Sequence, residues 1–356
     1  MAHPQDLIIS LAQLRSARSI GSMQMRITKG LGVTLGGGLL VGLAGLFYFA
    51  SQPPPKLVLQ LKWIYNAGFA GDFVAKEKFW KGLDVEVRPG GIGVDPIKQV
   101  TSGSAQIGVA TGDQLLLAVG NEEAPIIAIA LVYQENPLAW IAKKDTGIQG
   151  PADLRGRTVG LTFTDDEPLF RAMLRKLGLE EQQLTIERVG FDASKFLRNE
   201  VDALPVFRNT QGTELSLQLA KDRIDTVFVG PSDLGIVSYS NLYFTSRSFA
   251  KENPEKVVAF LRGALRGWRF AQSEARETAL IVAQYDKETN VDVIKACVAA
   301  TNKLVKPVEN VAIGSMSKEG WEATQEILLT SGSLKERVNV ETIFTNEYAE
   351  AAANEQ

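Results

Sequence analysis

The sequence predicts an α/β protein of two lobes, preceded by a membrane-spanning or signal segment. Three observations predict this architecture. Short apolar strand patterns alternate with helical patterns from residue 57 to residue 132. The same alternation restarts at residue 158, after the turn-rich stretch 145–151 (DTGIQGP). An uncharged apolar run, LGVTLGGGLLVGLAGLFYFA, extends from Leu31 to Ala50.

The composition excludes several classes of protein. The 356 residues are 45% hydrophobic and 22% charged with a net charge of −3, which is typical of a globular protein and lacks the basic excess of a nucleic-acid binder. The chain contains one Cys, Cys297, and one His, His3. These residues supply neither a disulfide, nor a Cys/His zinc site, nor a His-based triad. We expect no catalytic residue, no metal site, no cofactor and no nucleic-acid partner.

The apolar run is long enough to span a bilayer, for which about 20 residues suffice. Four basic residues precede it, and Asp6 is the one acidic residue in the same segment. The basic residues are Arg15, Arg18, Arg26 and Lys29. Positive flanks stay in the cytoplasm, so we expect residues 1–30 to be a cytoplasmic tail and the body to be exported. Cleavage after Ala50 would place Tyr48 where a small residue is needed. We therefore favour a membrane anchor at 31–50, with the body in the periplasm or extracellular space, over a cleaved signal that would release it.

The pattern of residues after 56 predicts two α/β lobes, followed by a mostly helical segment that rejoins the first lobe. In the first lobe we expect strands at 57–61, 83–87, 107–110 and 125–132, and helices at 69–80, 96–100 and 114–119. In the second we expect strands at 158–161, 184–189, 203–206 and 226–229, and helices at 168–177 and 194–199. After Tyr243 the pattern is mostly helical, with one apolar face running from Val257 to Trp268.

Strands that alternate with helices indicate largely parallel sheets. We expect one lobe at 56–138 and 236–335, the other at 139–235, and a C-terminal tail at 336–356. Two such lobes suggest a hinged protein that binds its ligand in a cleft, at the carboxyl ends of the strands.

Four motifs, taken in order, resemble one family. They are LQLKWIYNAGFAG at 59–71 with VAKEK at 74–78, RPGGIGVDP at 88–96, SGSAQIGVA at 102–110 and DLRGRTVGL at 153–161. Together they resemble the thiamine-pyrimidine-precursor binding proteins, a branch of the type II periplasmic solute-binding superfamily. The resemblance implies a two-lobed type II periplasmic-binding-protein fold, a small heteroaromatic ligand such as a thiamine pyrimidine precursor, and an ABC permease as partner.

Enzymes that build the thiamine pyrimidine share the family's fold, and this chain departs from them. They use a histidine in the first loop and a cysteine-rich motif in the second lobe. Here the first position carries Phe69, and residues 202–209 read DALPVFRN, without Cys. We therefore expect a binding protein rather than an enzyme. A synthase-like enzyme, a riboflavin- or sulfonate-binding protein and a tethered sensor domain remain as alternatives.

Candidate ligand contacts follow strands in both lobes. In the first lobe, Trp63 can stack on a flat ring, and Asn66 can present a donor and an acceptor to a ring edge. Phe69 is a second ring wall or a core residue. Thr111 and Asp113 stand at a strand-to-helix junction, where Asp113 is a helix cap or a ligand contact.

In the second lobe the matching junction carries four further candidates: Thr162, Thr164, Asp165 and Glu167. Consecutive acids at a helix start usually complement the helix dipole. We favour that role, with one acid accepting a hydrogen bond from a ligand amino group. Asn209 follows another strand of this lobe and completes the expected site.

Overall fold

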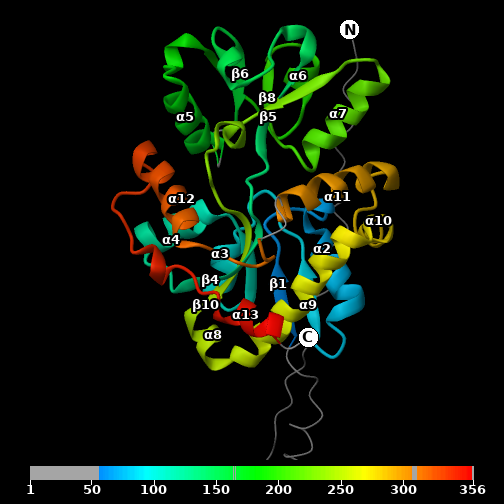
Figure 1. Ribbon diagram of the computed structural model, residues 1–356, viewed down its shortest axis with the longest axis vertical. Helices are drawn as coiled ribbons and strands as arrows, with labels where there is room; N and C mark the ends of the chain where they lie inside the picture. The colour runs from blue at the N-terminus through cyan, green and yellow to red at the C-terminus, as the bar shows by residue number, and fades with distance from the viewer. Residues whose placement is uncertain (1–55, 163, 165, 307–310, 355–356) are drawn as a thin grey trace, which may run out of the picture. The chain divides into compact units, whose positions relative to one another are not determined.

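Two five-stranded sheets, each with helices on both faces, form the two lobes of the protein (Figure 1). The computed structural model describes residues 56–162, 164, 166–306 and 311–354. The chain passes from the first sheet to the second between β4 (Ile126–Tyr133) and β5 (Leu138–Lys143), and returns between β9 (Thr226–Val229) and β10 (Ser240–Ser246). We refer to the sheet that contains β1 and its helices as lobe 1, and to the other as lobe 2.

The sheet of lobe 1 has the strand order β2-β1-β3-β10-β4. Strand β1 is parallel to β2 and to β3, whereas β10 is antiparallel to β3 and β4. Leu57 and Leu59 of β1 join the hydrophobic cluster on one face of the sheet, and Val58 between them joins the cluster on the other. The strands are β1 (Leu57–Gln60), β2 (Val85–Arg88), β3 (Ile107–Ala110), β4 (Ile126–Tyr133) and β10 (Ser240–Ser246).

The sheet of lobe 2 repeats this plan with the order β7-β6-β8-β5-β9. Strand β6 is parallel to β7 and β8, and β5 is antiparallel to β8 and β9. Trp140 of β5 is fully buried on one face, where its indole donates to the carbonyl of Gly160 at 2.9 Å. The strands are β5 (Leu138–Lys143), β6 (Thr158–Leu161), β7 (Thr185–Arg188), β8 (Ala203–Phe207) and β9 (Thr226–Val229).

The α/β two-lobed architecture is confirmed, but the sheets are mixed rather than largely parallel. The difference comes from β5 and β10, which the sequence pattern does not predict. Each is the strand by which the chain enters a lobe from the other one, and each lies antiparallel between two strands of its new sheet. Because a central strand is covered on both faces, β5 lacks the polar alternation that identifies a half-exposed strand.

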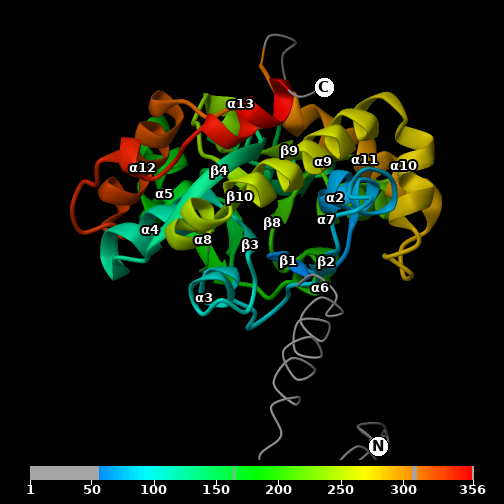
Figure 2. The same cartoon turned by 90° about the horizontal axis from the view of Figure 1, so that it is seen from below.

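Helices cover both faces of the lobe 1 sheet, with α3, α4 and α12 on one side and α2, α9, α10 and α11 on the other (Figure 2). Glycines allow α2 and α9 to cross closely, since a Cβ on Gly267 would lie 2.1 Å from the carbonyl oxygen of Gly71. The helical segments of this lobe are η1 (Ala67–Phe69), α2 (Ala70–Val74), η2 (Ala75–Phe79), α3 (Pro96–Thr101), α4 (Gly112–Glu122), α8 (Arg247–Glu252), α9 (Pro254–Ser273), α10 (Ala275–Val282), α11 (Val291–Val305) and α12 (Lys318–Ser331).

Lobe 2 is packed in the same way, with α5 on one face of its sheet and α6 and α7 on the other. Two helices of lobe 1 also contact it. Helix α11 packs against α7, and α12 packs against α5, where Ile327 meets the lobe 2 core. The helical segments are η3 (Lys144–Thr146), η4 (Pro151–Leu154), α5 (Asp166–Leu177), η5 (Glu181–Gln183), α6 (Ser194–Leu197), α7 (Gln211–Lys221) and η6 (Pro231–Leu234).

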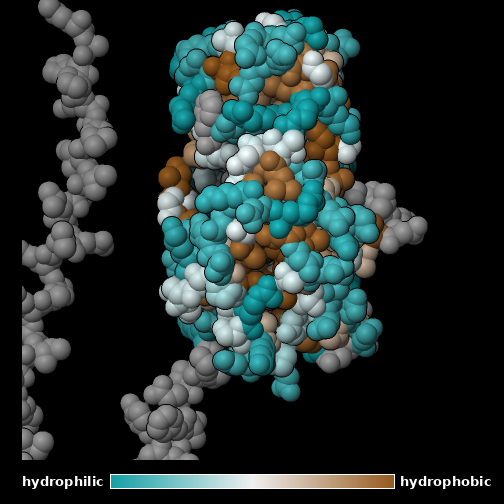
Figure 3. Space-filling view, turned by 90° about the vertical axis from the view of Figure 1, so that its left-hand side faces the viewer, coloured by the Kyte–Doolittle hydropathy of each residue, from teal (hydrophilic) through white to brown (hydrophobic). Residues whose placement is uncertain are grey.

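The C-terminal residues pack on lobe 1. The segment expected as a tail contains η7 (Val340–Thr342) and α13 (Glu347–Asn354). Helix α13 packs against α9 and β4 and buries Ala349 and Ala352. On the side of the molecule that carries α5 and α12, apolar residues show only in separate patches among hydrophilic ones (Figure 3), as expected when most apolar side chains are inside.

The expected membrane segment, residues 31–50, lies outside the described residues. Among the helices that the structure describes, none is long and apolar enough to cross a bilayer.

One buried carboxyl lies in the lobe 1 core. Asp72 of α2 is 1% exposed and accepts a hydrogen bond from the Tyr243 hydroxyl, which in turn accepts one from the Trp268 indole at 2.8 Å. Burial raises the pKa of Asp72 to about 7, although the Tyr243 hydrogen bond opposes the shift. The folded protein therefore holds a proton at Asp72 that the unfolded chain releases near pH 4.

This proton makes the stability of the protein depend on pH. A raised pKa stabilises the folded state below about pH 4, and this contribution is lost as the pH rises to about 7. Asp72→Asn should remove this dependence. As the pH rises through this range, the free energy of unfolding of the wild type should therefore fall relative to that of the variant. Urea titrations across the range measure the difference, with Asp84→Asn, at an exposed position, as the charge control. Parallel pH profiles for wild type and Asp72→Asn would contradict the assignment.

Candidate functional site

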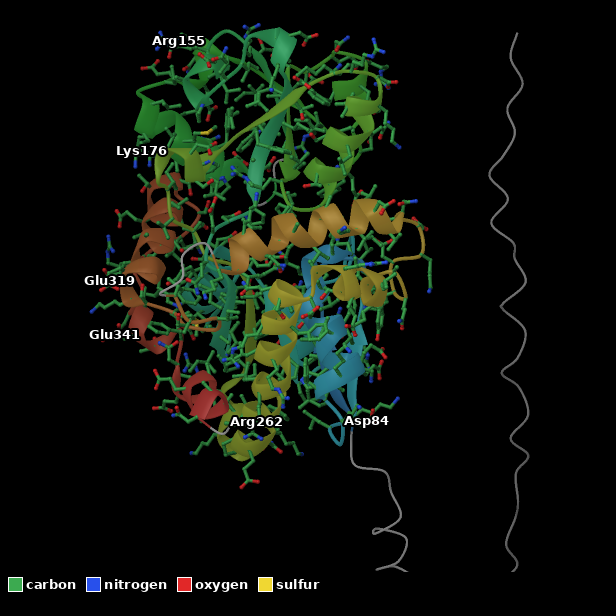
Figure 4. All side chains as sticks on the ribbon, turned by 45° about the vertical axis from the view of Figure 1, so that its right-hand side comes forward. Asp84, Arg155, Lys176, Arg262, Glu319 and Glu341 are labelled. Carbon is green, nitrogen blue, oxygen red and sulfur yellow. The ribbon has the colours of Figure 1, made fainter. Side chains whose placement is uncertain are left out.

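The carboxyl ends of the parallel strands in the two sheets point toward each other. Asp84, which precedes β2, lies at the end of lobe 1 farthest from lobe 2, and Arg155, which precedes β6, lies at the outer end of lobe 2 (Figure 4). The residues that follow β1, β3, β6 and β8 therefore face the boundary between the lobes. Ligands of open α/β sheets bind at such strand ends, and we call this region the interlobe boundary.

Aromatic rings line the interlobe boundary. The rings of Trp63, after β1, and Phe191, after β7, have centroids 5.4 Å apart at an angle of 52°. The Lys62 ammonium lies 5.0 Å from the centroid of the Phe207 ring, at the end of β8. Trp63 is half-buried and packs against the lobe 1 core, whereas Phe191 is 50% exposed. Lobe 2 thus brings an open aromatic face to the indole.

The backbone of the Trp63 loop is held by the loop that follows β2. The Gly90 N–H donates to the carbonyl of Trp63 at 2.9 Å. A Cβ on Gly90 would lie 2.4 Å from the carbonyl oxygen of Leu61 and 2.5 Å from the nitrogen of Trp63. Any side chain at this position would push the two loops apart, so Gly90 sets the position of the indole.

A polar connection also crosses the interlobe boundary. Asn209 of lobe 2 donates from Nδ2 to the Tyr133 hydroxyl at 3.2 Å and to the Thr301 hydroxyl at 2.9 Å. The Tyr133 hydroxyl donates to the carbonyl oxygen of Gly68 at 2.6 Å, and Asn241 donates to the same oxygen at 3.3 Å. Asn209 is 2% exposed and Asn241 4%. We call these five residues the polar bridge.

Two candidates from the first loop point in different directions. The Asn66 side chain accepts from the Gly68 N–H at 2.8 Å and so caps η1. Phe69 is 2% exposed and belongs to the lobe 1 core cluster. Asn66 therefore positions the backbone that carries the Gly68 carbonyl, and Phe69 packs as a core residue.

Thr111 and Asp113 stand where β3 turns into α4. The Thr111 N–H donates to the side-chain oxygen of Gln114 at 3.2 Å, and Thr111 is buried. Asp113 is half-buried in the first turn of the helix. Both residues lie at the carboxyl end of β3, next to the start of β10, where Gly112 donates to the carbonyl of Tyr239 at 2.9 Å.

At the corresponding junction of lobe 2, Asp166 forms hydrogen bonds with the residues just before it. The Asp166 carboxylate accepts from the backbone and hydroxyl of Thr162, at 2.6 and 2.8 Å, and from the backbone of Thr164 at 3.0 Å. Glu167 pairs with Arg171 one turn along α5 at 2.9 Å. Asp166 therefore holds the residues that precede α5, and the ion pair of Glu167 lies along the helix. Asp165 lies outside the described residues.

The structure thus places two of the candidates, Trp63 and Asn209, in contact with the opposite lobe. It adds three residues that the sequence does not single out: Tyr133, Phe191 and Asn241. The sequence could have indicated Phe191, because it follows the predicted strand at 184–189. It could not have indicated Asn241, because the strand that carries Asn241 has no recognisable pattern.

The described residues contain no group of three or more His, Cys, Asp or Glu side chains that could hold a metal ion. The interlobe boundary offers aromatic faces, hydroxyls and carboxamides, together with the charged side chains of Lys62 and Arg208. Aromatic faces and carboxamides bind flat polar molecules by stacking and hydrogen bonds.

Residues 66–278 match the family model described as NMT1/THI5 like. This match spans more than half of the chain and includes η1, all of lobe 2 and the return to lobe 1. The chain belongs to the NMT1/THI5-like family. The resemblance drawn from the motifs of residues 59–161 is therefore confirmed.

The chain is similar to the formylaminopyrimidine-binding protein of Halalkalibacterium halodurans, with 25% identity over 81% of this chain and 89% of that one. It is similar to the riboflavin-binding protein RibY of Chloroflexus aurantiacus, again with 25% identity, over 82% of this chain and 86% of that one. Among solved structures, it resembles the periplasmic aliphatic sulphonate binding protein SsuA of Escherichia coli. That match has a TM-score of 0.66 and 16% identity, and covers 83% of this chain and 93% of the other. This likeness confirms the two-lobed fold of periplasmic binding proteins.

The polar bridge predicts a measurable contribution of the Tyr133 hydroxyl to stability. Tyr133→Phe removes the donor to Gly68 and the acceptor for Asn209 in a buried region, which should lower the free energy of unfolding by about 1–3 kcal/mol. Urea titration measures the change. Tyr348→Phe, which loses a single half-buried bond to the Ala250 carbonyl, is the control and should lose less. A Tyr133→Phe protein as stable as the wild type would show that the bridge does not hold the lobes.

Proposed function

We propose that this protein is an exported solute-binding protein of an ABC-type importer and that it holds a small, flat heterocycle at the interlobe boundary. One observation carries the proposal: the facing strand ends bring aromatic rings and carboxamides from both lobes to the same boundary. The binding proteins named among the relatives support it. Formylaminopyrimidine and riboflavin are both nitrogen heterocycles, and a thiamine pyrimidine precursor is our leading ligand.

The mechanism follows from the connections between the lobes. Within the described part of the chain, the segments between β4 and β5 and between β9 and β10 carry the backbone from one lobe to the other. A ligand that touches Trp63 on one lobe and Phe191 on the other favours the closed arrangement over an open one, because it contacts both lobes only when they approach. A permease that recognises the closed arrangement would then receive only loaded protein.

We propose binding without catalysis. Cys297 is buried, and its thiol donates to the Thr210 carbonyl at 3.8 Å. Burial raises the pKa of this thiol to about 12, so that it stays protonated and is a poor nucleophile. The single histidine of the sequence, His3, precedes the matched family region. The ligand should therefore leave the protein chemically unchanged.

We also propose that Leu31–Ala50 anchors the body to the outer face of the cytoplasmic membrane, because this apolar run follows Arg26 and Lys29. External protease should then digest residues 56–354 in intact spheroplasts. Digestion that occurs only after lysis would place the body in the cytoplasm and contradict the proposal.

Trp63 should contribute to ligand binding. Trp63→Ala removes a stacking surface worth about 0.5–1.5 kcal/mol beyond the area it buries, and should weaken affinity up to about tenfold. Melting curves with and without formylaminopyrimidine or riboflavin measure this, and mass analysis of the recovered ligand checks that it is unchanged. Leu280→Ala, on an exposed apolar residue of α10, is the control.

In this experiment a ligand-induced shift in melting temperature that is equal in Trp63→Ala and wild type would rule out Trp63 as a ligand platform. A large drop in the melting temperature of the ligand-free variant would instead identify Trp63 as a structural residue, since it also packs on the lobe 1 core. A chemically altered ligand would overturn binding without catalysis.

A further inference from the structure

The direction of each hydrogen bond linking Asn209 to Asn241 is fixed by one atom, the carbonyl oxygen of Gly68. This oxygen can only accept. The Asn241 carboxamide must therefore turn its NH₂ group toward it, and the Tyr133 hydroxyl must point its proton at it. Burial raises the pKa of Tyr133 far above its usual value, so the hydroxyl keeps that proton.

The assignment of donors and acceptors in lobe 1 also fixes the orientation of Asn209 in lobe 2. Because the Tyr133 proton is committed to Gly68, its oxygen can only accept from Asn209, which must present its own NH₂ group. The carboxamide oxygens of Asn209 and Asn241 are consequently turned away from these partners. Both oxygens are buried and have no hydrogen-bond partner in the described structure. A buried acceptor left in this state is unfavourable, and a ligand or an ordered water normally satisfies it.

The position of Asn241 is unusual for a strand residue. The register pairs Leu242 with Ala110 on β3 and Ser240 with Tyr133 on β4, which places Asn241 between the carboxyl ends of these two strands. Its φ is 49°, in the left-handed region. Asparagine tolerates this conformation better than other residues with a side chain, and glycine adopts it without strain. Glycine would therefore preserve the backbone here and delete only the carboxamide.

We propose that the side-chain oxygens of Asn209 and Asn241 accept hydrogen bonds from two N–H or O–H groups of the ligand, one from each lobe. The inference rests on the proposed function and narrows its ligand class. At these two oxygens the site selects a heterocycle that carries amino, amide or hydroxyl donors, which a sulfonate, bringing only acceptors, cannot supply.

The nearby cations do not reverse this selection. Arg208, next to Asn209, has carboxylates on both sides, with Glu135 at 3.8 Å and Asp233 at 3.8 Å. These ion pairs offset its charge, whereas its Nε and Nη2 atoms are buried without a hydrogen-bond partner in the described structure and can donate to an acceptor atom of the same ligand. The Lys62 ammonium lies over the Phe207 ring.

The test is a calorimetric titration of the full chain with three probes: formylaminopyrimidine, its formyloxy analogue in which an oxygen replaces the formylamino N–H, and pentanesulfonate. The variants are Asn241→Gly and the matched control Asn199→Gly. Asn199 also has a left-handed backbone, with φ 59°, but it lies in lobe 2 on the surface, where its oxygen accepts from Lys143.

We expect Asn241→Gly to bind formylaminopyrimidine about tenfold more weakly than the wild type, while Asn199→Gly binds it normally. We also expect the wild type to prefer formylaminopyrimidine to the sulfonate and to the formyloxy analogue. Glycine suits the backbone of both positions, but each variant loses one hydrogen bond, to the Gly68 carbonyl or from Lys143, so both melting temperatures should fall and binding is measured well below them.

Three results would contradict these expectations in distinguishable ways. Equal binding by Asn241→Gly and wild type would show that Asn241 serves the backbone alone and would overturn the inference. Preference for pentanesulfonate would overturn the donor selection while leaving solute binding in place. A wild-type protein that binds none of the probes would overturn the proposed function and the inference with it.

Discussion

Strand β10 lies between β3 and β4, hydrogen-bonded to both, and this insertion sets the geometry of the boundary between the lobes. The chain reaches β10 only after it has built the whole of lobe 2. The strand therefore closes the lobe 1 sheet and ties the two lobes together at the same place. Asn241 lies at the point where β10 enters the sheet, next to the carboxyl ends of its neighbours, and from there it reaches the Gly68 carbonyl.

From this point the site is built by two kinds of contact. The polar bridge joins the lobes through groups whose donors and acceptors are fixed by one carbonyl oxygen. The aromatic contact of Trp63 with Phe191 joins them through a surface that stays partly open, because Phe191 is half-exposed. The buried polar bridge fixes how the lobes are positioned, whereas the partly exposed aromatic rings offer a surface on which a ligand can stack. The combination suits a protein that must close on a small molecule and release it again.

Much of this fold was predictable from local patterns, and the exceptions have one physical cause. A few residues are enough to recognise strand β1, in which Leu57 and Leu59 lie on one face and Val58 on the other. The same is true of helix α9, which has Val257 and Trp268 on one face. Strands β5 and β10 cannot be recognised in this way, because their sequences, LAWIAK and SNLYFTS, do not alternate between apolar and polar residues and their pairing is set by the tertiary structure. The same limit applies to the site. Trp63 and Asn209 follow predicted strands, whereas Asn241 and Tyr133 act through partners that only the tertiary structure brings near. Among the described acids after Thr162, Asp166 bonds to the residues before α5 and Glu167 pairs with Arg171 along the helix.

The central claim is that the lobes hold one small heterocycle between them, and native mass spectrometry of the full chain, purified without denaturation, tests it most directly. The account predicts one non-covalent adduct per chain with the mass of a nitrogen heterocycle, either retained on purification or formed on addition of formylaminopyrimidine or riboflavin. The adduct should be lost on unfolding, since neither lobe alone supplies both Trp63 and Asn209. A chain that carries no adduct on isolation and forms none with either compound would contradict the account.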